Sequence, residues 1–147
     1  MKQVTIATFV ILLLAQCSRE EREVAPGVAK LVGTWQLVDP ASAYAVTFVL
    51  ALDTANPPND IIHFKANGQS AINTYTAFLS AAVDGLMVVT SVGSTKMGGS
   101  SEATTAEQTY FARLRDVVRY ELSGANQLRL FYGGNKPGVL VYDRLKL

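Results

Sequence analysis

The chain has one cysteine, Cys17, and one histidine, His63, and these are the side chains best suited to chemistry. A nucleophilic site would need a serine or cysteine beside a base, and His63 is the one imidazole that could be that base. The Gly-x-Ser-x-Gly turn that presents a serine nucleophile does not occur in the sequence. Alternation along a strand places His63 with Lys65, opposite Ile62 and Phe64, on a solvent-facing side. We therefore predict no catalytic residues and a protein that is not an enzyme.

The other potential ligands are too scattered to predict a metal or cofactor site. Zinc sites are built from groups of cysteine and histidine, and this chain has one of each. Asp53, Asn59 and Asp60 lack the ordered oxygen series of a calcium loop, and we expect solvated loop residues there. The run Gly93-Ser94-Thr95-Lys96 lacks the spacing of a phosphate-binding loop. We predict no metal and no cofactor.

The charges of the chain nearly cancel. Lysine and arginine total 13 and aspartate and glutamate total 12, which leaves a net charge of +1. Proteins that bind nucleic acid depend on a surplus of basic residues to displace counterions from phosphates. We therefore predict no nucleic-acid partner.

An apolar run over residues 4–14 follows Met1 and Lys2. A membrane-spanning helix needs about 20 apolar residues, whereas this shorter run is typical of the centre of a secretory signal. The run ends in Leu14-Ala15-Gln16-Cys17, which resembles the lipobox of bacterial lipoproteins, although Gln16 replaces the usual small residue. We expect a lipoprotein signal peptide over residues 1–16 and lipid attachment at Cys17. The alternatives are an uncleaved anchor with a free cysteine, or an ordinary signal peptide cut elsewhere.

The lipobox resemblance also implies a location and a membrane contact. It implies acyl chains such as palmitate on Cys17 and a place in the cell envelope, and Ser18 after the cysteine favours the outer membrane over the inner. The following mixed-charge segment is poor in apolar residues and cannot form a core. We expect residues 17–30 to be a solvated tether.

The pattern beyond residue 30 predicts many short strands and one helix. Trp35 and Leu37 alternate with polar residues, and residues 44–50, 61–65 and 86–92 show similar strand patterns. An apolar stripe with helical spacing predicts one helix near residues 105–117, beginning at Thr105 in a capping box with Gln108. We predict an α+β domain over residues 31–147. An antiparallel curved β-sheet or partial barrel should pack around that single helix.

Several segments of this domain resemble, in order and spacing, the META domain of the HslJ-like family. They are residues 31–38, 64–68, 73–75, 95–97, 107–114 and 120–130. The family pattern has cysteines at the positions of Ile72 and Gly99, so no thiol role carries over to this chain. The resemblance implies a β-rich fold around a helix, no established catalytic chemistry, and an envelope or secreted protein associated with stress or drug tolerance.

We therefore expect a lipid-anchored envelope protein that is a non-catalytic binding or stress-tolerance module. Its partner would be another envelope protein or a small apolar ligand. Because binding residues are often found in loops, we expect the contact with that partner to be made by loops. The expected partner-contact residues are Asn59, Lys96 and Lys136, each in a different loop. The alternative rests on Gly33-Thr34-Trp35, which is similar to the Gly-x-Trp of lipocalins and implies a barrel that carries a small apolar ligand.

Overall fold

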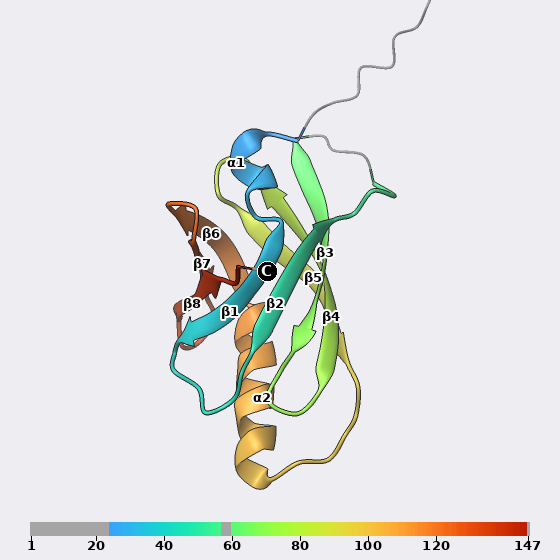
Figure 1. Cartoon of the computed structure of the whole chain (residues 1–147), viewed down its shortest axis with the longest axis vertical. Helices are drawn as coiled ribbons and strands as arrows, with labels where there is room; N and C mark the ends of the chain where they lie inside the picture. Colours follow the sequence, from blue (N-terminus) through green and yellow to red (C-terminus); the bar gives the residue numbers. More distant parts are fainter. Residues whose placement is uncertain (1–23, 57–59, 147) are drawn as a thin grey trace, which may run out of the picture.

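Eight antiparallel strands form one sheet in the computed structural model, which describes residues 24–56 and 60–146 (Figure 1). The spatial order is β5-β4-β3-β2-β1-β8-β7-β6. In chain order the elements are α1 (Pro26–Ala29), β1 (Gly33–Asp39), β2 (Thr47–Leu52), β3 (Ile61–Gln69), β4 (Thr74–Ala82), β5 (Met87–Ser94), α2 (Ser101–Arg115), β6 (Val117–Ser123), β7 (Gln127–Tyr132) and β8 (Gly138–Arg144).

The sheet curls until its two edge strands meet at one end. Leu86, just before β5, forms a bridge with Arg119 of β6, and the Tyr120 amide donates to the Gly85 carbonyl at 2.8 Å. At the other end α2 runs into the opening (Figure 1) and buries Leu114 completely. The expected α+β fold, a curved antiparallel sheet or partial barrel packed around a helix, is confirmed.

Side chains fill the interior of this barrel. Strand alternation points one face of every strand inward, and the largest fully buried side chains come from most of the strands and from α2. They are Trp35, Tyr142, Phe48, Phe64, Leu31, Leu50, Leu79, Met87, Leu114, Leu128, Leu130 and Leu140. An interior packed in this way does not favour a carrier that holds its ligand inside the barrel.

The helix begins four residues earlier than predicted, because Thr105 is not its cap. The Ser100 hydroxyl accepts a hydrogen bond from the Ala103 amide at 3.1 Å and caps α2, whereas the Thr105 hydroxyl donates to the Ser101 carbonyl within the helix. Arg115 ends the helix, so the predicted last residue, Val117, belongs to β6. Polar residues predominate in the first turn of α2, so the spacing of apolar residues does not indicate where the helix begins.

The predicted tether is too long at its C-terminal end, and α2 is not the single helix. Residues 26–29 form the one-turn helix α1, whose Val28 is 1% exposed and part of the core. Val24 and Ala25 also pack against the core. A short apolar segment beside Pro26 carries too little periodicity to predict this turn, and residues 17–23 lie outside the described part.

Gly68 faces the barrel interior at a point where β2 and β3 approach each other closely. A Cβ atom there would overlap the Thr47 carbonyl oxygen and lie 2.9 Å from the Tyr75 ring. We expect Gly68→Ala to lower the free energy of unfolding by about 1–3 kcal/mol, because backbone must move to make room. Urea denaturation would measure this loss, with Gly98→Ala as control because nothing lies within 4 Å of its added Cβ. Equal stability of the two variants would contradict the prediction.

Candidate functional site

The most densely hydrogen-bonded carboxylate of the described chain is Glu107, which α2 presents to the turn between β3 and β4. One oxygen accepts hydrogen bonds from the Ser70 hydroxyl, from the Asn73 amide at 2.8 Å and from the Ile72 amide at 3.1 Å. The other accepts from the Asn73 side-chain amide at 2.7 Å. We call Glu107, Ser70 and Asn73 the Glu107 cluster.

Asn73 extends the cluster to the connection between β5 and α2. Its side-chain oxygen accepts from the Met97 amide at 2.7 Å and from the Thr95 hydroxyl at 2.8 Å. Burial raises the pKa of Glu107, but the hydrogen bonds from Ser70 and Asn73 outweigh it, so that the pKa lies below its usual value of 4.5. An ionised carboxylate with both oxygens occupied is suited to holding three segments together, not to acting on a substrate.

Three tyrosine hydroxyls form a second buried polar group, at the junction of α2 with the sheet. The Tyr75 hydroxyl donates to the Thr47 carbonyl at 2.8 Å and lies 2.7 Å from that of Tyr110, which lies 3.2 Å from that of Tyr142. Burial raises the pKa of Tyr110 to about 12 and raises those of Tyr75 and Tyr142 as well. These hydroxyls stay protonated at neutral pH and satisfy one another inside the core.

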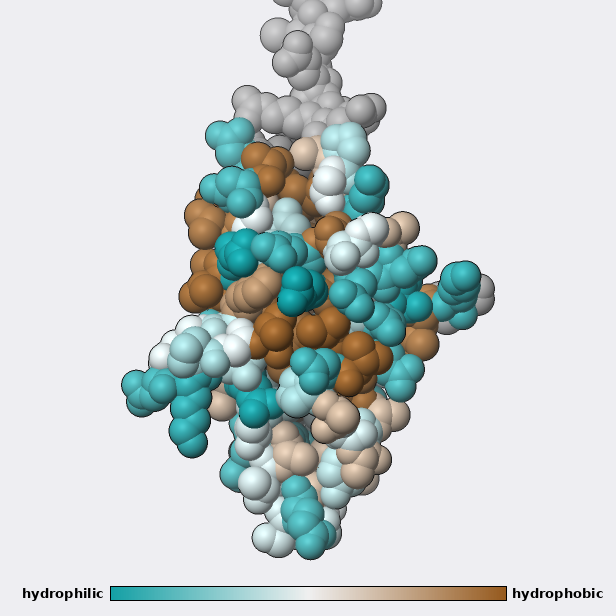
Figure 2. Space-filling view, turned by 90° about the vertical axis from the view of Figure 1, so that its left-hand side faces the viewer, coloured by the Kyte–Doolittle hydropathy of each residue, from teal (hydrophilic) through white to brown (hydrophobic). Residues whose placement is uncertain are grey.

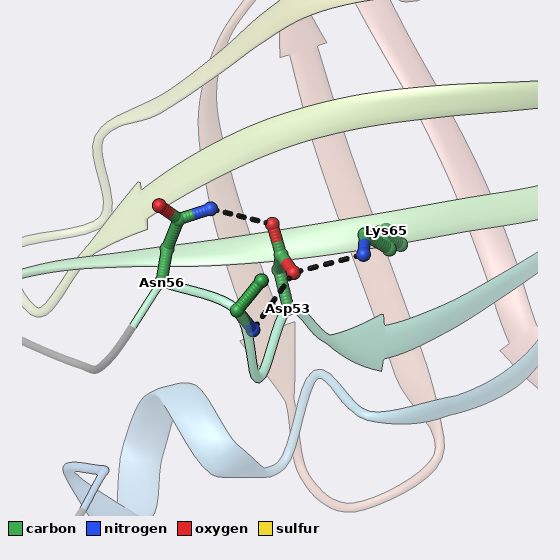
Figure 3. Close-up of polar contacts among 4 residues, drawn as sticks. Asp53, Asn56 and Lys65 are labelled. Carbon is green, nitrogen blue, oxygen red and sulfur yellow. Dashed lines mark hydrogen bonds and ion pairs between the residues drawn. The ribbon is translucent and has the colours of Figure 1, made fainter.

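Asp53, which we expected to be a solvated loop residue, is instead 7% exposed and tightly held after β2 (Figure 3). Its carboxylate lies 3.0 Å from the Lys65 ammonium and accepts from the Asn56 side chain at 2.8 Å and from the Ala55 amide at 3.2 Å. The hydrogen bonds with Lys65 and Asn56 lower the pKa of Asp53. The carboxylate therefore shapes the β2–β3 connection, a role that a local sequence pattern does not distinguish from a solvated loop.

His63 lies on the outer face of β3, as predicted, with Ile62 and Phe64 buried on the opposite side. Its Nδ1 atom is 2.8 Å from the Ser80 hydroxyl on β4. No carboxylate of residues 24–56 and 60–146 hydrogen-bonds to the ring, so the described part contains no third group to orient a Ser–His pair. The contact serves to link two neighbouring strands.

The described ranges contain neither a cluster of metal ligands nor a membrane-spanning helix. Within them, no group of three or more His, Cys, Asp or Glu side chains is placed to hold a metal ion. None of the helices in this part of the chain is long and apolar enough to cross a bilayer.

Two of the three expected partner-contact residues, Lys96 and Lys136, lie in the described part of the chain. Asn59 lies outside the described residues. Lys96 is exposed in the β5–α2 connection and Lys136 is exposed in the β7–β8 turn, and these two segments lie on opposite sides of α2 (Figure 1). The two lysines therefore remain separate candidate contacts.

The described residues line surface clefts that the sequence did not predict. One of about 730 Å³ crosses the outside of β2 to β5 over residues such as Asn67 and Thr76. Another of about 730 Å³ lies beside α1 and is lined by Val28, Tyr120 and Arg129. A third, of about 290 Å³, lies along α2. Each combines segments distant in the chain, which explains why local patterns missed them.

The outer face of β6 to β8 carries an apolar area ringed by polar side chains (Figure 2). Phe131 pairs with Val139 across the β7–β8 ladder, and Val141 is opposite Arg129. The guanidinium of Arg119 lies 4.2 Å from the Phe131 ring centroid and covers part of the area.

Comparison with known proteins decides the family. The family model described as META domain matches residues 29–144, which contain all eight strands and α2. The chain belongs to the META-domain family. An NMR structure of a protein from Burkholderia xenovorans has the same fold, with a TM-score of 0.57 and 20% identity, over 88% of this chain and 97% of that chain. No curated protein matches this chain.

The META resemblance drawn from short motifs is therefore confirmed, and the structure shows why two of those motifs occur together. Asn73 and Glu107 lie in separate motifs and meet in the Glu107 cluster. In this META domain the cluster holds α2 against the turn between β3 and β4.

Proposed function

We propose that this META-domain protein is anchored to the cell envelope by acyl chains on Cys17 and acts there as a non-catalytic module that binds another envelope protein. The observation that carries the anchor is the apolar run over residues 4–14, whose last residue, Leu14, is followed directly by Ala15-Gln16-Cys17. More than one buried acyl chain gives firm attachment, so no basic patch is needed. The outer membrane is the proposed location, because Ser18 follows the cysteine.

The short interval between Cys17 and Val24, which packs against the core, supports a domain held close to the membrane. Val24 stands seven positions after Cys17. Even a fully extended chain would span about 25 Å over that interval, at about 3.3–3.6 Å per residue. The chain leaves the domain at the α1 end, whereas the β5–α2 connection with Lys96 lies at the far end (Figure 1). A partner in the envelope could reach that connection without displacing the anchor.

The chemistry of the described residues supports a non-catalytic role. Glu107 has both oxygens engaged, and the buried tyrosines satisfy one another. His63 contacts Ser80 on an open strand face with no carboxylate bonded to its ring in the described ranges. Since binding needs a surface more than a reactive group, the exposed loops and clefts support this function. A contribution to stress tolerance would follow from the partner that is bound.

Acylation provides the direct test of the anchor. In a bacterial host supplied with labelled palmitate, we expect the wild-type chain to incorporate label and Cys17→Ala to incorporate none, because no other cysteine is present. Ser18→Ala is the matched control, since it changes the neighbouring residue and keeps the thiol. Equal labelling of the wild type and Cys17→Ala would contradict the proposal.

A further inference from the structure

The cleft along α2 has an apolar floor and polar edges. It lies between α2 and the β1–β2 connection and measures about 290 Å³. Val46, Tyr110 and Leu140 line it and are at least 95% buried, so they form a packed floor. Ala106 lines it from α2, one turn before Tyr110, and its small side chain leaves the space open. An apolar ligand group would therefore lose water-exposed surface on entry.

Arg113 is the one charged side chain among the described residues that line this cleft. It is half-buried, and its guanidinium carbon lies 5.6 Å from the Tyr132 ring centroid. None of the ion pairs in the described ranges includes Arg113. The cation is thus positioned by an aromatic ring and not by a carboxylate, and its hydrogen-bond donors are left for another acceptor.

Two hydroxyl groups add to the polar edge. Ser42 on the β1–β2 connection and Thr109 on α2 line the cleft and are exposed. Their side chains can donate to an oxygen acceptor that also contacts the guanidinium of Arg113. The edge therefore presents donors of hydrogen bonds beside an apolar floor.

We propose that the α2 cleft binds a small amphipathic carboxylate, with the carboxylate on Arg113 and the apolar body against Val46 and Leu140. A guanidinium matches a carboxylate with two parallel hydrogen bonds. The volume lies at the lower limit for ligand pockets, which restricts the ligand to about one ring or one short chain. An uncharged apolar ligand fits less well, because it would remove water from Arg113 without supplying an acceptor. This site goes beyond the anchored module and does not depend on acylation of Cys17.

The test uses 3-phenylpropionate, which has one carboxylate and one ring, with the full chain in lipid nanodiscs. Isothermal titration would measure binding, and empty nanodiscs would correct for partition into lipid. We expect saturable binding of 3-phenylpropionate and at least about tenfold weaker binding of the uncharged 3-phenylpropanamide, because loss of a charge-assisted pair weakens affinity by that order. Absence of saturable binding, or equal binding of both compounds, would overturn the proposal.

Two variants locate the binding site. Arg113→Gln removes the cation, and we expect it to weaken 3-phenylpropionate at least about tenfold. Arg115→Gln is the matched control, because Arg115 lies on the same helix, stacks on Phe111 at 5.9 Å and does not line the cleft. Ala106→Leu should also abolish binding by filling the cleft. Unchanged affinity in Arg113→Gln or in Ala106→Leu, or an equal loss in Arg115→Gln, would overturn the assignment.

Discussion

Glu107→Ala lowers the free energy of unfolding by about 3 kcal/mol or more, because the substitution removes a charged acceptor that takes part in four hydrogen bonds. The Glu107 carboxylate accepts from Ser70, Ile72 and Asn73, and the first and last of these are almost fully buried. A hydrogen bond to a charged group contributes about 1.5–3 kcal/mol, and the second acceptors of Ser70 and Asn73 offset part of the loss. Urea denaturation followed by circular dichroism would measure the loss. A change below about 1 kcal/mol would show that water replaces the carboxylate.

The same carboxylate should make stability depend on pH. Because the folded pKa of Glu107 lies below its usual value of 4.5, the unfolded chain takes up the proton first as pH falls. Its contribution is thus fully present above about pH 4.5 and is lost as pH falls through the lower folded pKa. Glu107→Gln cannot titrate and is the matched control, with a smaller loss of stability on acidification than the wild type. Parallel pH profiles would contradict this role, since Asp53, whose pKa is also lowered, titrates in both chains.

Trp35→Ala should lower the free energy of unfolding by about 3–5 kcal/mol, the range for a large buried aromatic side chain. Trp35 is 0% exposed, its indole N–H donates to the Leu31 carbonyl at 2.9 Å, and the Arg144 guanidinium carbon lies 4.0 Å from its ring. A loss of this size approaches the total stability of many small domains. We therefore expect a much earlier urea transition, measured by circular dichroism because the single tryptophan is gone.

Two variants make the Trp35 measurement interpretable. Trp35→Phe keeps a ring and loses the indole hydrogen bond, so its loss should be smaller than that of Trp35→Ala and measurable even if the alanine variant does not fold. Val118→Ala is the surface control, because Val118 is 54% exposed and should change stability by less than about 0.5 kcal/mol. If Trp35→Phe and Val118→Ala were equally stable, the packing and hydrogen bond of Trp35 would be unimportant.

Local patterns were sufficient to predict strands at the positions of β1, β2, β3 and β5, and most of the helix α2. The alternation of Trp35 and Leu37, and the helical stripe through Tyr110 and Leu114, each reflect one element with one buried face. When one face of an element is buried, apolar residues recur at a fixed spacing along the chain. This spacing can be recognised within a segment of a few residues. The helix start at Ser101 escaped the same reasoning, because Ala103 is the single apolar residue of its first turn and one residue shows no period.

Tertiary structure decided which polar residues matter. Glu107 and Asn73 are 34 positions apart, and nothing near either residue in the chain predicts that they meet. Asp53 is buried, and the residue that pairs with it, Lys65, lies twelve positions later on β3. The cleft beside Arg113 likewise exists only after the β1–β2 connection packs along α2. Contacts of this kind depend on how the strands pair and where the helix enters the barrel. They join residues far apart in the chain, so they produce no periodic pattern in the local sequence.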